Sequence, residues 1–137
     1  MTKIAAKGTH IQKSISAVFT TIAQVTNISG PDAEVQTGDV TSLDGGVGME
    51  FASTGYVNGG TVSFTLWLDP VASTLQAITD DITTPASGSW KIKFSDSATT
   101  EWAFSGFVTK CSPTAEVNGH LTCDCEIKLT GIPTYPT

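Results

Sequence analysis

The residues of this sequence best suited to chemistry are three cysteines and one histidine near its C-terminal end. His120, Cys123 and Cys125 form the pattern H-x2-C-x-C, and Cys111 precedes them. A structural zinc site needs four ligands that converge tetrahedrally, usually from tight turns. Cys123 and Cys125 instead lie two apart in an alternating pattern, which places their α-carbons about 7 Å apart along one strand face. We therefore expect a buried apolar row here and no metal ion.

The three thiols leave several pairings open. A disulfide between Cys123 and Cys125 is not expected, because bridged α-carbons usually lie within about 6.8 Å of each other. Cys111 could face either of them across a hairpin, which would leave one thiol over. In a reducing compartment all three can be small buried hydrophobic residues. An unpaired thiol that reaches an oxidising exterior could instead cross-link neighbouring subunits, so Cys111, Cys123 and Cys125 are candidate inter-subunit disulfide thiols.

The other reactive groups form no recognisable catalytic pattern. The sequence has no GxSxG, P-loop, HExxH or dinucleotide-binding motif. His10 lies in the N-terminal segment, and His120 follows an Asn-Gly pair, where a solvated side chain is ordinary. Asp80 and Asp81 are expected at a solvated helix end. We therefore expect no enzyme activity, no catalytic residue and no cofactor.

Composition and charge exclude several classes of protein. The 137 residues, 39% of them hydrophobic, suit one globular domain over 1–137. The chain has 7 basic and 13 acidic residues, a net charge of −6, and no arginine. Nucleic-acid-binding proteins use Lys and Arg to neutralise phosphates, and membrane-surface proteins need a basic face, so neither class fits. No secretory signal and no run of about 18–20 apolar residues is present, so we expect synthesis in the cytoplasm and no membrane span.

Alternating apolar and polar residues predict strands over much of the chain. The predicted strands cover residues 18–28, 35–43, 61–69, 89–96, 101–110 and 121–130. Regular alternation is typical of a strand with one buried and one wet face. The segment 35–43 is the polar exception.

One segment has the period of a helix. Asp69 can cap it and Pro70 suits its first position, and apolar residues recur at spacings of 4, 3 and 4 from Val71 to Ile82. A helix over about 70–82 with one apolar stripe must lie on a sheet. The predicted fold is therefore mainly β, a β-sandwich or half-barrel with one flanking α-helix.

Three segments lack a clear period. Residues 44–60 contain six glycines and are predicted to form a long inter-strand loop. Met49, Phe51 and Tyr56 are hard to leave in water, so this loop is expected to dock on another subunit or on its own sheet. Residues 1–15 are predicted as an N-terminal arm, either frayed or crossing to a neighbour, and 132–137 as an extended C-terminal tail.

Three longer stretches occur in a distinctive order and together cover about residues 18–131. They are VFTTIAQVTNISGPDAEV from Val18, DVTSLDGGVGMEFASTGYVNGGTVSFTLWLDP from Asp39, and the helix followed by SGSWKIKFSDSATTEWAFSGFVTK and a final strand. None is a catalytic signature. In combination and order they resemble the phage major tail tube proteins of the siphophage type, with a lambda-like tail tube fold.

The resemblance implies a structural virion protein that forms hexameric rings, which stack into the hollow tube of the tail. In that family the long loop contacts adjacent subunits and rings, so the loop candidates here are Asp44, Met49, Phe51 and Tyr56. The resemblance also implies tape-measure and tail-terminator or baseplate proteins as partners, and assembly in the host cytoplasm. DNA would pass through the lumen without specific binding.

An acidic lining would suit such a lumen, because like charges repel. The candidates for this lining are Asp39, Asp44, Asp124 and Glu126. Two alternatives remain open. One is a monomeric β-sandwich module that binds a ligand such as carbohydrate, with Trp67 and Trp102 as its exposed aromatic residues. The other is a tube protein of the secretion-system type.

Overall fold

A computed structural model describes residues 3–43, 45–46 and 48–135 of the chain. Its strands are β1 (His10–Ile15), β2 (Val18–Thr21), β3 (Val25–Ser29), β4 (Glu34–Asp39), β5 (Phe51–Asn58), β6 (Thr61–Trp67), β7 (Gly88–Lys93), β8 (Glu101–Thr114) and β9 (Thr122–Thr134). The single helix in these residues is α1 (Ser73–Thr83). The mainly β fold with one flanking helix is confirmed. No helix of the described part is long and apolar enough to cross a membrane.

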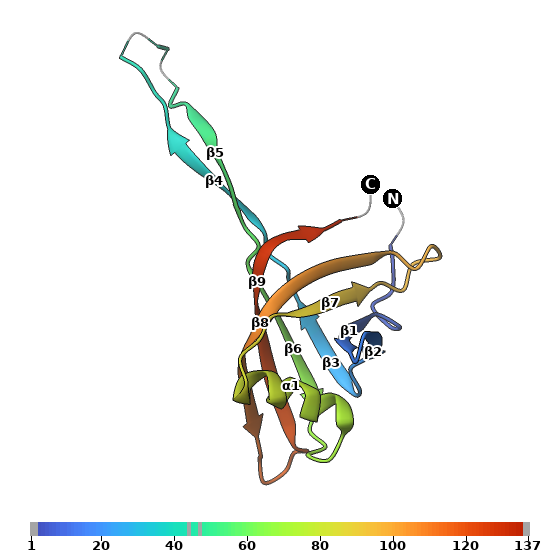
Figure 1. The fold of residues 1–137 in the computed structure, drawn as a ribbon. Helices are drawn as coiled ribbons and strands as arrows, with labels where there is room; N and C mark the ends of the chain where they lie inside the picture. Colours follow the sequence, from blue (N-terminus) through green and yellow to red (C-terminus); the bar gives the residue numbers. More distant parts are fainter. Residues whose placement is uncertain (1–2, 44, 47, 136–137) are drawn as a thin grey trace.

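Two antiparallel sheets make up the molecule. Seven strands form the body in the order β2-β1-β7-β8-β9-β6-β3, and β4 pairs with β5 in a separate ribbon. Figure 1 shows the long strands β8 and β9 bending across the body, and the β4–β5 ribbon projecting away from it. Strands β2 and β3 end the order without pairing to each other, so the body is an open half-barrel with two free edges.

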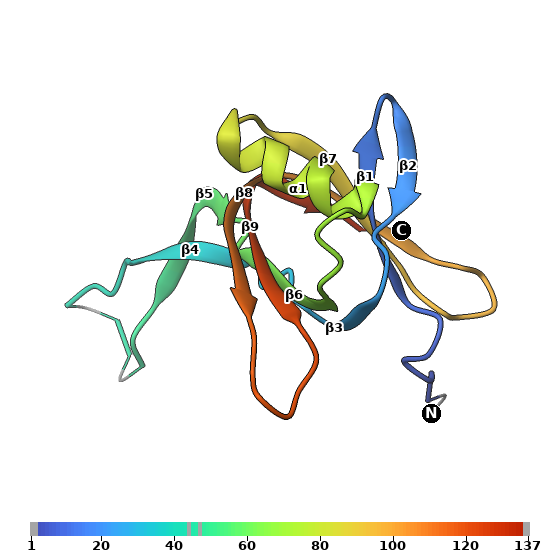
Figure 2. The same ribbon diagram turned by 90° about the horizontal axis from the view of Figure 1, so that it is seen from below.

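One face of the seven-stranded sheet carries the hydrophobic core. In β6, Val62, Phe64 and Leu66 are buried, while the residues between them face the other way. Figure 2 shows α1 lying against the sheet, and Leu75 and Ile78 of α1 are buried. The other core members are Ile11, Ile22, Trp90, Ile92, Phe104, Val108, Cys123, Cys125, Ile127 and Leu129. The alternation seen in the sequence therefore reflects one buried face.

The helix begins later than its sequence predicts. The Asp69 carboxylate accepts a hydrogen bond from the N–H of Val71 (3.2 Å) instead of capping the helix. This is an Asx turn, in which a side chain bonds the backbone two residues on. Ala72 is then still extended, with ψ of 132°, and α1 starts at Ser73. Consequently Val71 lies outside the helix and is exposed.

The segment 18–28, predicted as one strand, is two. β2 pairs with β1, whereas β3 pairs with β6 at the far end of the sheet. Between them Ile22 enters the core, and Gln24 takes a positive φ of 61° in the turn that separates the two strands. Apolar residues flank this turn on both sides, so the sequence pattern does not show it. Composition alone does not reveal that a residue has a left-handed conformation.

The three segments without a period also form strands. Residues 44–60, expected as a loop, include β5, which pairs with β4. Almost every side chain of this ribbon is exposed, so no alternation marks it in the sequence. The N-terminal arm contributes β1, whose Ile11 is fully buried between β2 and β7. At the other end, β9 continues to Thr134, which pairs with Ala103.

Candidate assembly surfaces

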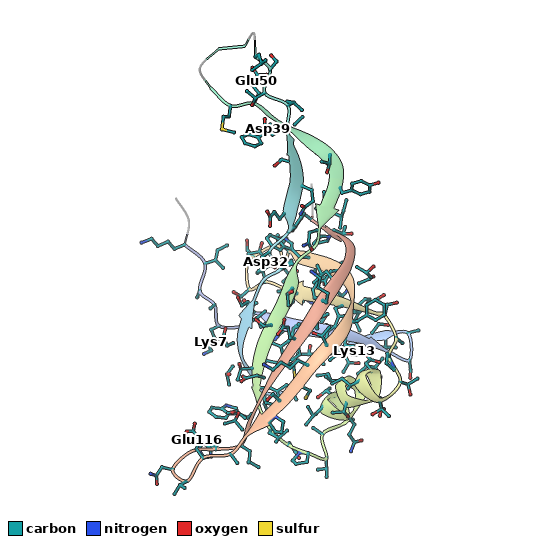
Figure 3. All side chains as sticks on the ribbon, turned by 90° about the vertical axis from the view of Figure 1, so that its left-hand side faces the viewer. Lys7, Lys13, Asp32, Asp39, Glu50 and Glu116 are labelled. Atoms are coloured by element: carbon teal, nitrogen blue, oxygen red, sulfur yellow. The ribbon has the colours of Figure 1, made fainter. Side chains whose placement is uncertain are left out.

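The β4–β5 ribbon presents apolar side chains to solvent. Met49 is 67% exposed, Phe51 59% and Tyr56 76%. Phe51 pairs with Asp39 at the distal end of the ribbon. Figure 3 shows Asp39 and Glu50 near that end, Asp32 at the root of the ribbon, and Glu116 at the opposite end of the molecule. Exposed aromatic residues grouped on a projecting element are typical of an interaction surface.

A network of hydrogen bonds extends the ribbon beyond its strands. The N–H of Thr41 donates to Asp39 Oδ1 (2.9 Å), and the N–H of Glu50 donates to Thr41 Oγ1 (2.7 Å). The N–H of Val40 donates to the carbonyl of Glu50 (2.9 Å). The hydroxyl and N–H of Thr41 together lower the pKa of Asp39. Asp44, the remaining loop candidate, lies outside the described residues.

The root of the ribbon is fixed to the body by polar contacts that sequence reasoning missed. The N–H of Thr61 donates to Asp32 Oδ1 (2.7 Å), which lowers the pKa of that carboxyl. Asn58 Oδ1 accepts hydrogen bonds from the N–H of Gly60 (3.0 Å) and from Lys128 Nζ (3.1 Å). Gly60 has a φ of +79°, and a side chain there would collide with Asp32. The Asn-Gly-Gly turn was the only sequence signal of this arrangement.

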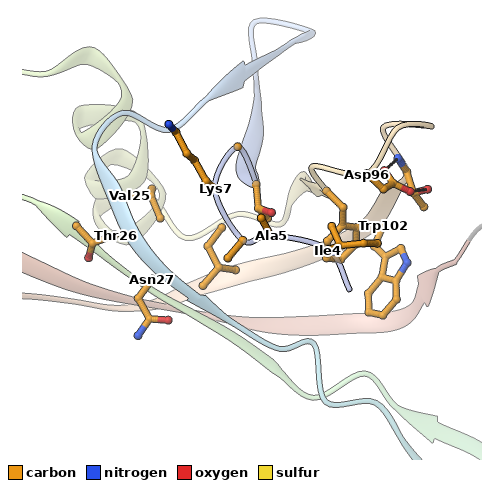
Figure 4. A pocket seen from close by; sticks show the side chains of 14 residues that line it. Ile4, Ala5, Lys7, Val25, Thr26, Asn27, Asp96 and Trp102 are labelled. Atoms are coloured by element: carbon orange, nitrogen blue, oxygen red, sulfur yellow. Dashed lines mark hydrogen bonds between the residues drawn. The ribbon is translucent and has the colours of Figure 1, made fainter. Parts of the chain in front are cut away.

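The free edge of β3 borders a cavity of about 820 Å³. Figure 4 shows the N-terminal residues Ile4 and Ala5 lying between β3 and Trp102. The ring of Trp102 lies edge-on to Phe94 (5.1 Å) and to Tyr135 (4.7 Å). An apolar hollow beside the free edge of a strand can accept chain from another molecule.

The face of the sheet opposite the core is polar and carries both signs of charge. Asp124 accepts a hydrogen bond from Thr65 Oγ1 (2.8 Å), and Glu126 faces Lys110 in register. The charged residues on this face of β7, β8 and β9 are Lys91, Lys93, Glu101, Lys110, Asp124, Glu126 and Lys128. Asp39 lies far from them on the ribbon, so the structure does not bring the predicted lumen candidates together (Figure 3).

The two tryptophans proposed for a carbohydrate site do not share a face. Trp67 is 43% exposed on the polar face and lies edge-on to His120 (5.6 Å). Trp102 pairs with Ile92, whose side chain is buried on the core face. A sugar-stacking platform would need neighbouring aromatic rings on one surface, and these two residues do not supply it.

The three cysteines meet inside the body. Cys123 and Cys125 are almost fully buried, as the alternation predicts, and Cys111 is half-buried. Their three sulfur atoms lie 2.9–3.8 Å apart. No histidine or carboxylate of the described residues joins this group, so it offers three of the four ligands that zinc usually takes.

Comparisons with known proteins show what this architecture is. No protein family and no curated protein matches the sequence. Among solved structures, the tail of an empty gene transfer agent particle with C6 symmetry contains a similar chain, with a TM-score of 0.82 and 17% identity over 98% of this chain and 100% of that one. The SPP1 tail tube gives a TM-score of 0.72 and 10% identity over 98% of this chain and 80% of that one. The chain has the fold of tail tube proteins.

The tail tube fold also occurs in a contractile machine. The sheath-tube complex of PVC, an extracellular contractile injection system, contains a chain with a TM-score of 0.71 and 15% identity, over 98% of this chain and 93% of that one. The resemblance seen in three stretches of sequence is therefore confirmed as a likeness of fold. The ribbon is part of that fold, because the matches cover 98% of this chain.

Proposed function

We propose that this protein is the repeating structural subunit of a phage-type tail tube. Copies form hexameric rings, the rings stack into a hollow tube in the virion tail, and the tube conducts DNA into the host. The observation that carries the proposal is the full-length likeness to chains from assembled tails, one of them with C6 symmetry. The role is structural rather than catalytic.

Ring formation uses the two free edges of the half-barrel. Strands β2 and β3 each pair on one side only, so their other edges have backbone groups available to a neighbour. Joining the β2 edge of one copy to the β3 region of the next would continue the sheet around a ring. The apolar hollow beside β3 would be covered at the same time.

Stacking of rings uses the β4–β5 ribbon. Met49, Phe51 and Tyr56 are its apolar contacts with the adjacent ring, with Asp44 as a polar neighbour in sequence. Full burial of such a side chain contributes about 1.5–3 kcal/mol. Three such contacts per subunit, repeated around a ring, would contribute to holding successive rings together.

Passage of DNA depends on a lining that does not hold phosphate. We assign Asp39, Asp44, Asp124 and Glu126 to this lining, with Asp39 on the ribbon and Asp124 and Glu126 on the polar face of the body. Asp124 and Glu126 lie among lysines on the polar face, so they offset positive charge that would otherwise attract DNA. Replacing both by lysine is expected to slow DNA ejection from intact tails. Unchanged ejection would contradict this assignment.

The remaining partners follow from the same role. A tape-measure protein would occupy the tube during assembly in the host cytoplasm, and tail-terminator and baseplate proteins would bind its two ends. Because the fold also occurs in a contractile injection system, a contractile particle is an equally good setting for the same tube.

Electron microscopy of the purified protein tests the proposal. Rings or tubes are expected for the natural chain, and Phe51→Ser is expected to yield rings that stack poorly, because it removes one apolar contact of the ribbon. Val117→Ser is the control for loss of an exposed apolar side chain outside the ribbon, since Val117 is fully exposed in the turn between β8 and β9. A stable monomer that binds glycans would refute the proposal and favour a ligand-binding module.

A further inference from the structure

The cysteine cluster, formed by Cys111, Cys123 and Cys125, depends on an irregularity in β8. The register of β8 against β9 shifts between Val108 and Lys110, so Thr109 is an extra residue. Strict alternation from Val108 would point Cys111 to the polar face. The bulge instead returns Cys111 to the core side, opposite Cys125. Cys123 faces Pro113 and is therefore a diagonal neighbour of Cys111.

Two of the three thiols are much closer to each other than to the third. Cys111 Sγ lies 2.9 Å from Cys123 Sγ, whereas Cys125 Sγ lies 3.7 Å from Cys111 and 3.8 Å from Cys123. A disulfide bond is about 2.05 Å long, so the closest pair needs to approach by roughly 0.9 Å. The geometry thus singles out one pair.

The same pair can be reached from outside. A cavity of about 400 Å³ lies between α1 and the strands β8 and β9, and Cys111 and Cys123 both line it. Thr79 and Thr83 of α1 line the opposite side. Cys111 retains partial exposure, whereas Cys123 is 1% exposed. A small reagent would therefore meet Cys111 first.

We propose that Cys111 and Cys123 form an oxidation site that takes low-molecular-weight disulfides as its oxidant. In the first step the Cys111 thiolate attacks one sulfur of the small disulfide, a mixed disulfide forms, and one small thiolate leaves. In the second step the Cys123 thiolate attacks Cys111 Sγ, the internal disulfide forms, and the second small thiolate leaves. Two electrons pass to the small disulfide, and the two cysteine protons end on the two small thiols released.

Burial of Cys123 slows the second step at neutral pH. Burial, together with the neighbouring Cys111, raises the pKa of Cys123 to about 11. Because only the thiolate attacks, the rate of closure rises about tenfold for each pH unit below that value. Burial raises the pKa of Cys125 still further. Cys125 is therefore not expected to attack the mixed disulfide, although it faces Cys111 in register.

The site acts within one chain and does not depend on the proposed assembly role. Cys123 is too deeply buried to reach a sulfur on another folded subunit, and its nearest sulfur is already Cys111. The bond would join the end of β8 to the start of β9, close to the turn that connects the two strands. It would be absent in a reducing cytoplasm and would form once the folded protein meets an oxidising medium.

Mass spectrometry of the natural chain after exposure to oxidised glutathione tests the proposal. After the treated chain is unfolded in denaturant, we expect two of its three thiols to resist alkylation. We expect a mixed disulfide on Cys111 as the intermediate, and the mapped bond to join Cys111 to Cys123. The natural chain needs no variant for this result. Cys125→Ala should preserve the bond, and Cys111→Ala should abolish both the mixed disulfide and the bond.

Several outcomes would overturn the proposal. Three thiols that stay free in the folded chain would do so, as would a mapped bond that includes Cys125. Chains cross-linked to one another on a non-reducing gel would instead support inter-subunit disulfides. A soft metal ion that copurifies with the chain in a 1:1 ratio and blocks alkylation of all three thiols would assign the cluster to metal binding.

Discussion

Replacing Gly60 by alanine tests how the ribbon is fixed to the body. Gly60 has a φ of +79°, and an added Cβ would lie 2.6 Å from the carbonyl oxygen of Asp32 and 2.8 Å from its carbon. Both atoms belong to the backbone, so they cannot swing aside as a flexible side chain would. The Asp32 carboxylate also accepts the N–H of Thr61, and this bond would be displaced with it.

Gly131 provides a matched control for this change. Its φ of +80° is almost the same, but an added Cβ would meet nothing within 4 Å. A left-handed conformation costs a residue with a Cβ about 1–2 kcal/mol, and the stiffer unfolded chain offsets about 0.4–1 kcal/mol of this. Gly131→Ala should therefore lower the free energy of unfolding by about 1 kcal/mol. Gly60→Ala adds a steric collision, worth about 1–3 kcal/mol in overpacked sites.

Urea unfolding of dilute subunits, followed by tryptophan fluorescence, measures this difference. With a urea slope of about 1–3 kcal/mol/M, a difference of 2 kcal/mol corresponds to a shift of about 1 M in the midpoint. The slope itself should not change, because both variants expose the same surface when they unfold. Equal midpoints for Gly60→Ala and Gly131→Ala would refute the steric account of the ribbon root.

Three further predictions concern the body. Lys13→Met should destabilise the fold by about 1–3 kcal/mol, because Lys13 Nζ lies 3.0 Å from Asp81 Oδ2 in a largely buried pair and its loss leaves that carboxylate without its partner. Adding Asp81→Leu removes the unpaired charge, so thermal unfolding of the double variant should show part of the lost stability restored. Ile78→Ala should cost about 2–5 kcal/mol, and the half-exposed Ile82→Ala clearly less, in urea unfolding. The hydrogen bond from Thr61 lowers the pKa of Asp32, so the folded state binds the proton of this carboxyl less tightly than the unfolded state does. The ionised carboxylate therefore stabilises the fold at neutral pH, and this stabilisation is lost as the pH falls below about 4. Asp32→Asn should make the free energy of unfolding depend less on pH in this acidic range.

The strands of the body could be predicted because one of their faces is buried. Val62, Phe64 and Leu66 alternate with hydroxyl residues since the core takes every second side chain. The ribbon could not be predicted in this way, because both of its faces are exposed in a single subunit and no alternation is imposed on it. Phe51 and Tyr56, predicted to lie in a loop, are exposed residues of β5, and their role as inter-subunit contacts stays a prediction.

The thiol cluster shows a different limit of sequence reasoning. Cys123 and Cys125 were placed together on a buried face by their spacing alone. The position of Cys111 depends on the bulge at Thr109, which changes the face of every later residue in β8. No residue near Thr109 predicts a bulge from the sequence. The proximity of the three sulfur atoms is therefore visible only from the register of the paired strands.

The projecting ribbon has a consequence for the kinetics of the proposed assembly. An isolated two-stranded hairpin is only marginally stable in water, and nearly all side chains of this ribbon are exposed in a single subunit. In the proposed tube, a neighbouring ring would cover Met49, Phe51 and Tyr56 and so complete the ordering of the ribbon. The first two rings must therefore order the ribbons of both rings at once, whereas each later ring binds to a tube end whose ribbons are already ordered. Growth from a template is then faster than spontaneous initiation, and a pool of free subunits can persist in the cell until a starting platform is present.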